Sequence, residues 1–151
     1  MTKTALALAA AMTSCGVLEP DLGAPLEAGA TDGPEIIFGR DIRPLMDRDA
    51  EDPSGHGCKA CHYSTEPSHV GTDVTGLDLS TLGGLRKGGV DTQNNIVVPY
   101  SPEASALVQK LRGTFGLGVR MPKNGPAYWS ESDIELVEQW IAQGAKGDDS
   151  E

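Results

Sequence analysis

Aromatic residues and long apolar runs are scarce in this chain of 151 residues. Only 5% of the residues are aromatic, whereas 19 are glycine, so side chains alone can build only a limited core. Small domains of this kind often recruit a metal or a cofactor. No stretch reaches the ~18 apolar residues of a membrane-spanning helix, which excludes a polytopic membrane protein. Three cysteines are too few, and odd in number, for a disulfide scaffold.

Basic residues are outnumbered by acidic ones. The chain has 22 Asp and Glu against 12 Lys and Arg, a net charge of −10. This sign argues against a nucleic-acid partner. Much of the acidity lies in residues 16–35 and 148–151, which contain no basic residue, whereas residues 86–123 hold six basic side chains against two acidic ones. We therefore expect residues 86–123 to dock on an acidic patch of a protein partner.

The amino terminus has the order of an export signal. A basic start at Lys3 is followed by the apolar run 4–12, which is too short to span a bilayer. The run ends in Met-Thr-Ser-Cys, which resembles a bacterial lipobox. The resemblance implies that residues 1–14 are a lipoprotein signal peptide and that Cys15 is the lipidated residue. A plain secretory signal with an incidental cysteine is the alternative.

The segment after the signal has the composition of a tether. Residues 15–35 are rich in Pro, Gly, Ala and acidic side chains, so they cannot bury enough apolar surface to order themselves. Their expected reach is ~25 Å. A lipid-anchored protein on the periplasmic side of the cell envelope follows from this arrangement. No Asp follows Cys15, which favours the outer membrane.

Three segments carry helix signals. Residues 41–46 form a short amphipathic element with Pro44 in its first turn. A second helix is expected from Ser101, as N-cap before Pro102, to a stop at Gly113. A third begins after Ser130, or after Ser132 if that residue and Glu135 form a capping box, and ends at Gly144.

No convincing strand pattern occurs, and the glycine-rich stretches 83–84, 88–89 and 113–118 are expected to be loops. The sequence thus predicts a small all-α domain with long loops over residues 36–147, followed by an acidic tail at 148–151.

The residues that carry chemistry are Cys58-Lys59-Ala60-Cys61-His62. This is the C-x-x-C-H motif of covalent c-type haem attachment. At positions i, i+3 and i+4 of a helical turn, Cys58, Cys61 and His62 share one face. Both thiols can then add to the haem vinyl groups, and the imidazole can bind the iron. Export agrees with this prediction, because this haem is attached outside the cytoplasm.

Two other chemistries use the same residue types. A redox dithiol would use Cys58 and Cys61, but the βαβ context of a thioredoxin-like protein is missing. A zinc site would add His56 or His69, but structural zinc usually needs a second, separated pair of ligands.

Met121 is the expected second axial ligand. It lies in Arg120-Met121-Pro122, about 60 residues after His62 and between the second and third predicted helices. His/Met ligation raises the reduction potential relative to His/His ligation and suits electron transfer. We interpret His56 and His69, the rival ligands, as surface histidines, and we expect Met46 in the core.

At this point the sequence resembles a known family. The motifs that carry the resemblance are Asp41 to Leu45, Cys58 to His62, Gly76 to Leu79, Gly88-Gly89, Val98 to Leu107, Arg120 to Pro122 and Trp140 to Ala145. In this order they resemble the class I mono-haem cytochrome c fold, and more closely the planctomycete-type cytochrome c domain. The resemblance covers residues 36–146. It implies one covalent haem c, attached at Cys58 and Cys61, with its iron held by His62 and Met121.

Two features depart from the family pattern. Residues 47–57 form a polar, acidic insert between the first helix and the haem motif, and Tyr63 follows His62 where glycine is commoner. Neither replaces a ligand, but the insert changes any partner surface on that side.

The resemblance implies a one-electron carrier with redox-protein partners, and no enzyme with a substrate site of its own. A haem-based sensor or small-ligand binder, in which Met121 is displaced, is the main alternative. A subunit of a larger envelope complex is another.

Overall fold

The structure is a computed structural model that describes residues 33–49, 52, 56–123, 125 and 127–151. The helical elements are η1 (Phe38–Ile42), α1 (Arg43–Met46), α2 (Lys59–His62), α3 (Val70–Thr75), α4 (Leu82–Lys87), η2 (Gln93–Asn95), η3 (Pro102–Ala104), α5 (Ala106–Arg112) and α6 (Glu131–Ala142). The described residues contain no strand, which confirms the all-α prediction. The predicted signal peptide, Cys15 and the tether up to residue 32 lie outside the described residues.

The first predicted helix is present but begins earlier. Its first turn, η1, is a π-helical turn, because the Arg43 N–H donates to the Phe38 carbonyl five residues earlier. Pro44 lies in the first turn of α1, where its missing N–H costs no helical hydrogen bond.

The second predicted helix is broken at Ser105. Residues 102–104 form only the short turn η3, Ser105 is extended, and α5 starts at Ala106. The Ser101 side chain makes no cap hydrogen bond, so the predicted N-cap is wrong. The buried Ser105 hydroxyl instead accepts from Val98 N at 2.8 Å and donates to Ser101 O at 2.9 Å. This competition with backbone hydrogen bonds is typical of serine. Gly113 ends α5 in the left-handed conformation, as expected.

The third predicted helix is confirmed as α6. The Ser130 hydroxyl accepts from Asp133 N at 3.2 Å, so Ser130, and not Ser132, is the N-cap. Its apolar stripe, Ile134, Val137 and Ile141, is buried together with Trp140. Gly144 follows the last turn with a positive φ of 98°.

The prediction of a loop at 83–84 is wrong, because both glycines lie in α4. Tertiary contacts explain them. A Cβ on Gly84 would lie 2.4 Å from Asp78 O, so no other residue fits there. The Thr81 hydroxyl caps α4 by accepting from Gly84 N at 3.0 Å.

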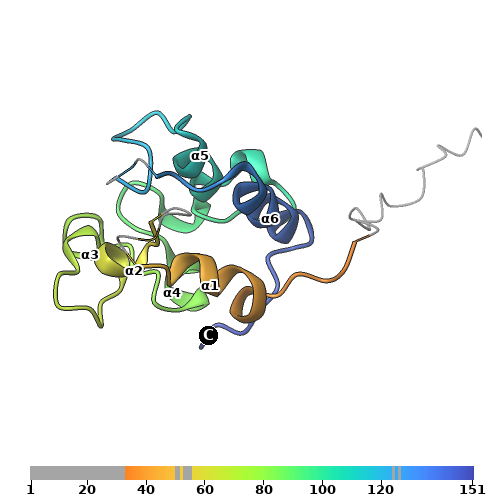
Figure 1. Ribbon diagram of the computed structural model, residues 1–151, viewed down its shortest axis with the longest axis horizontal. Helices are drawn as coiled ribbons and strands as arrows, with labels where there is room; N and C mark the ends of the chain where they lie inside the picture. Colours follow the sequence, from red (N-terminus) through yellow and green to blue (C-terminus); the bar gives the residue numbers. More distant parts are fainter. Residues whose placement is uncertain (1–32, 50–51, 53–55, 124, 126) are drawn as a thin grey trace, which may run out of the picture.

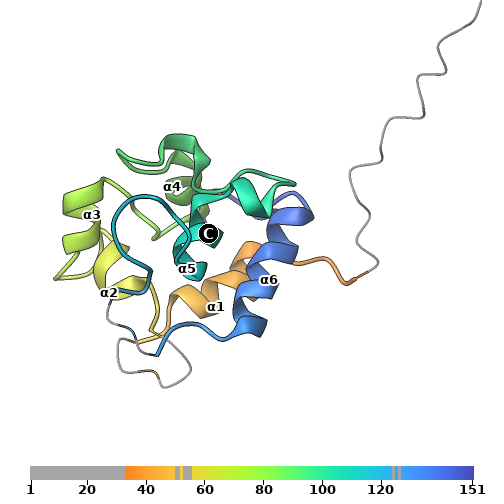
Figure 2. The same ribbon diagram turned by 90° about the horizontal axis from the view of Figure 1, so that it is seen from above.

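The core lies between η1 and α1, which are continuous, and the helices α4, α5 and α6 (Figures 1 and 2). Phe38 and Trp140, both fully buried, pack with ring centroids 5.6 Å apart. Met46 is fully buried as well, which confirms its predicted place in the core.

Both ends of the described chain are bound to this core. Gln143 accepts from Ile36 N at 2.8 Å and donates to Pro34 O at 3.1 Å. The acidic tail 148–151 contacts α4, where Leu82 N donates to Glu151 O at 2.7 Å. In both views, residues 33–37 leave the molecule at the side opposite to α2 and α3 (Figures 1 and 2).

No helix in the described part of the chain is both long and apolar enough to cross a membrane.

Candidate functional site

The predicted attachment motif forms one helical turn. Cys58 is the N-cap of α2, and its carbonyl accepts from Cys61 N at 3.2 Å and from His62 N at 2.9 Å. Cys58 N donates to Met46 O at 2.8 Å, which fixes this turn to the end of α1. The structure therefore brings Cys58, Cys61 and His62 together on one turn, and both cysteines are free and half-buried.

The His62 imidazole is oriented by a backbone carbonyl. Its Nδ1 lies 3.2 Å from Leu77 O, which can only accept, so Nδ1 carries the proton and Nε2 keeps its lone pair. Burial lowers the pKa of His62, although the Leu77 carbonyl and Asp78 act in the opposite direction. A neutral imidazole with a free Nε2 is the form that binds a metal.

Helix α3 packs against the His62 ring. A Cβ on Gly71 would lie 2.8 Å from both Cε1 and Nε2 of His62. Only a glycine leaves that space beside the imidazole. The α3 backbone therefore packs closely against the Nε2 side of the ring.

The thiol of Cys58 is not a reactive thiolate. Burial, the Asp47 carboxylate and the neighbouring Cys61 raise its pKa to about 12. Catalytic dithiol pairs show the opposite shift, because a lowered pKa supplies the nucleophilic thiolate. This electrostatic setting weighs against the dithiol alternative.

Met121 lies in the loop that joins α5 to α6. Its backbone N–H donates to Lys110 O at 2.9 Å, so the loop is fixed to the last turn of α5. The Arg120 side chain donates to Leu111 O at 2.7 Å and stacks over Tyr128 at 4.1 Å. The loop lies on the same side of the molecule as α2 and α3 in both views (Figures 1 and 2).

The rival histidines have other contacts. His69 Nδ1 lies 2.6 Å from Glu66 O, and its Nε2 is 3.4 Å from Asp73. The His56 carbonyl accepts from Trp129 Nε1 at 2.7 Å, and within the described residues its buried Nδ1 has no hydrogen-bond partner. Both rings are half-buried. The described residues contain no group of three or more His, Cys, Asp or Glu that could hold a metal ion.

Tyr63 contacts the first residue of the segment 47–57. Tyr63 is buried, and its hydroxyl donates to Asp47 of the insert at 2.7 Å. Arg43 donates to the same carboxylate at 3.1 Å and stacks over the Tyr63 ring at 5.1 Å. Burial and the Asp47 carboxylate raise the pKa of Tyr63, so this phenol stays neutral.

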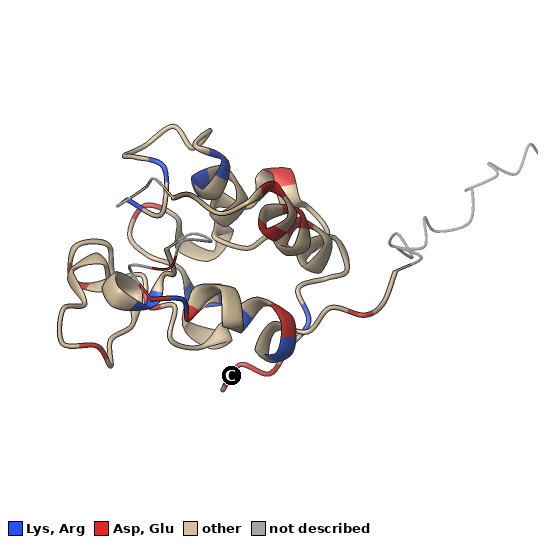
Figure 3. Cartoon of the chain, in the orientation of Figure 1, with Lys and Arg blue, Asp and Glu red and all other residues tan. Residues whose placement is uncertain are grey.

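Two of the six basic side chains of residues 86–123 are paired with acidic ones. Figure 3 shows how basic and acidic residues are distributed over the fold. Arg86 pairs with Asp149, and Arg112 pairs with Glu131 at 2.9 Å and Glu138 at 2.5 Å. Lys123, two residues after Met121, is exposed. The positive charge that is available for docking on a partner is therefore smaller than the number of basic residues indicates.

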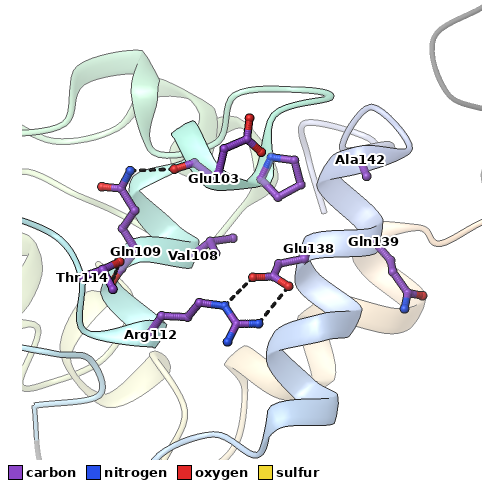
Figure 4. Close-up of a pocket in the computed structure, with 9 residues that line it drawn as sticks. Glu103, Val108, Gln109, Arg112, Thr114, Glu138, Gln139 and Ala142 are labelled. Carbon is purple, nitrogen blue, oxygen red and sulfur yellow. Dashed lines mark hydrogen bonds and ion pairs between the residues drawn. The ribbon is translucent and has the colours of Figure 1, made fainter.

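A pocket of about 510 Å³ lies between η3, α5 and α6 (Figure 4). Arg112 and Glu138 cross it with two hydrogen bonds, at 2.5 and 2.9 Å. None of the predicted site residues lines this pocket. It is therefore separate from the candidate site.

The sequence did not reveal the residues around His62. Leu77 acts through its backbone carbonyl, and Gly71 acts through its lack of a side chain, so neither has a motif signal. The only available signal was a glycine nine residues after His62, and glycines are common in this chain. No family model, curated protein or solved structure matches the chain.

Proposed function

We propose that this protein is an exported c-type cytochrome that transfers single electrons through one covalent haem c. The observation that carries the proposal is the turn 58–62, in which two free thiols and a neutral, oriented imidazole share one element. The residue types, their spacing and the hydrogen bond to Leu77 all fit an attached haem.

Each residue of the site has a distinct role in this proposal. Cys58 and Cys61 would hold the haem by thioether bonds, while His62 Nε2 and the Met121 sulfur would bind its iron. When bound, the haem supplies reversible one-electron chemistry, and His/Met ligation favours a high potential. With His62 and Met121 both holding the iron, no place would be left on it for a substrate, so we propose a carrier and not an enzyme.

The proposed anchor agrees with the direction of the chain. Residues 33–37 leave the domain opposite to α2 and α3 (Figure 1). If Cys15 is lipidated, the tether would join the domain on the side opposite to the proposed haem site.

Optical spectroscopy tests the proposal. The exported protein should give a c-type pyridine haemochrome with one haem per chain, and the oxidised form should show the weak far-red band of Met–Fe(III) ligation. His62→Ala should abolish that spectrum, whereas His69→Ala should leave it unchanged. A protein without haem, from cells able to attach it, would contradict the proposal.

The sensor alternative makes a different prediction. Met121 lies in a loop with exposed Leu117 and Val119, at 57% and 52% of their full exposure, so displacement of this loop is the specific point to test. Rapid binding of carbon monoxide by the ferrous protein would favour the sensor. Slow or negligible binding would favour the electron carrier.

A further inference from the structure

Two threonines of α3 hold the peptide groups of Leu77. The Thr72 hydroxyl donates to Leu77 O at 3.2 Å, and Leu77 N donates to Thr75 Oγ1 at 3.2 Å. The same Leu77 carbonyl accepts the Nδ1 proton of His62, also at 3.2 Å. The carbonyl therefore uses both of its lone pairs, one for the imidazole and one for Thr72.

The turn that makes this arrangement possible follows directly after α3. Gly76 adopts φ 67°, so the chain reverses and Leu77 returns beside the helix. Thr75 completes the arrangement, since its hydroxyl donates to Gly71 O at 2.6 Å while its oxygen accepts from Leu77 N. Leu79 N, further along, donates to His62 O at 2.8 Å. These bonds connect α3, the turn and the His62 backbone in one part-buried network.

We propose that Thr72 and Thr75 are positioning residues that set the electron-donating strength of His62 through the Leu77 peptide. This inference rests on the proposed function, with His62 as an iron ligand. A ligating histidine that donates its other N–H to a carbonyl becomes more basic. Such hydrogen bonding is one of the means by which a protein sets the potential of a haem.

The expected direction follows from the geometry. Without the threonine hydroxyls the Leu77 carbonyl is less restrained, and its hydrogen bond with Nδ1 lengthens. The imidazole then donates less charge, which disfavours the oxidised iron more than the reduced iron. The reduction potential should therefore rise.

The test compares Thr72→Val and Thr75→Val in the haem-loaded, full-length protein. Each should shift the ratio of oxidised to reduced protein about threefold at a fixed ambient potential, which is about 28 mV for one electron. The serine variants at the same positions keep the hydroxyl and should retain the wild-type potential. As a second readout, the His62 Nδ1 proton should exchange faster with solvent in both valine variants, measured by NMR.

Thr72→Val is the decisive variant, because valine matches threonine in shape and removes only the hydroxyl that donates to Leu77 O. An unchanged or lowered potential in this variant, with a wild-type spectrum, would overturn the inference. So would an equal shift in Thr72→Ser. A wild-type protein that carries no His-ligated haem would instead contradict the proposed function, so the two failures are distinguishable.

Discussion

Gly71 packs so closely against the His62 imidazole that an added Cβ would lie 2.8 Å from its Cε1 and Nε2 atoms. The added Cβ would also lie 2.7 Å from Cys61 O, so the ring, α2 or α3 must move in Gly71→Ala. Overpacking of this kind costs about 1–3 kcal/mol. We expect a smaller fraction of protein with the His62-ligated haem spectrum, and a lower unfolding midpoint.

Gly116→Ala is the matched control. It lies in the loop that carries Met121, but a Cβ at Gly116 would meet no atom within 4 Å. This variant should keep the spectrum and the stability of the wild type. Equal behaviour of the two alanine variants would show that the contact between Gly71 and His62 has no consequence.

The second prediction concerns Met121. Met121→Leu removes the sulfur but keeps a similar volume, so the far-red band should disappear and the ferrous protein should bind carbon monoxide. Met46→Leu is the control, because Met46 is fully buried in the core. It should cost less than about 1.5 kcal/mol of unfolding free energy and leave the spectrum intact. A far-red band that survives in Met121→Leu would mean that another methionine binds the iron.

The third prediction uses the ion pair that joins the insert to α6. Arg48 lies 2.8 Å from Asp133, and the two side chains are only 16% and 17% exposed. The hydrogen bond from Arg48 holds the pKa of Asp133 below its usual value of 3.8, although burial acts against it. Asp133→Asn should therefore lower the free energy of unfolding by about 2 kcal/mol at pH 7.

The pH dependence of this effect has a definite sign. The folded protein binds a proton at Asp133 less readily than the unfolded chain does, so the stabilisation is complete above pH 3.8. It is lost as the pH falls through the lowered pKa of the folded state. Denaturant titrations at several pH values should show the difference between wild type and Asp133→Asn shrinking below about pH 4. Glu135→Gln, at an exposed carboxylate of the same helix, should show no such difference at any pH.

The sequence correctly predicted those elements that depend on residues close to one another in the chain. The cap at Ser130 and the stripe of α6 lie within one helix, and so do the i, i+3 and i+4 positions of Cys58, Cys61 and His62. The structure bears out both arrangements. The all-α class followed from the same local signals.

Long-range contacts explain what the sequence could not reveal. Ser105 breaks the second helix because its hydroxyl bonds Val98, and α4 tolerates two glycines because Asp78 and the carboxyl-terminal residues approach them closely. Leu77 orients His62 through a backbone carbonyl 15 residues away. A backbone group has no sequence signature, so such partners become visible only in the folded chain.

The fourth prediction concerns docking. Arg86 and Arg112 are paired with acidic residues. Lys123, by contrast, is exposed in the same loop as Met121. We expect Lys123→Gln to weaken association with an anionic surface, such as a carboxylate-coated electrode, about two- to fivefold at low salt, the effect of one exposed charge pair.

Lys146→Gln removes the same charge at the other side of the molecule, where Lys146 pairs with Glu35 at 2.6 Å. Adsorption and electron-transfer rates measured from low salt to 0.15 M should separate the two variants only at low salt, because a Debye length of about 8 Å screens exposed charges at the higher value. A local docking site requires that Lys123→Gln has the larger effect. Equal effects would mean that net charge alone governs the encounter, and rates independent of salt would remove the electrostatic argument for docking through this loop.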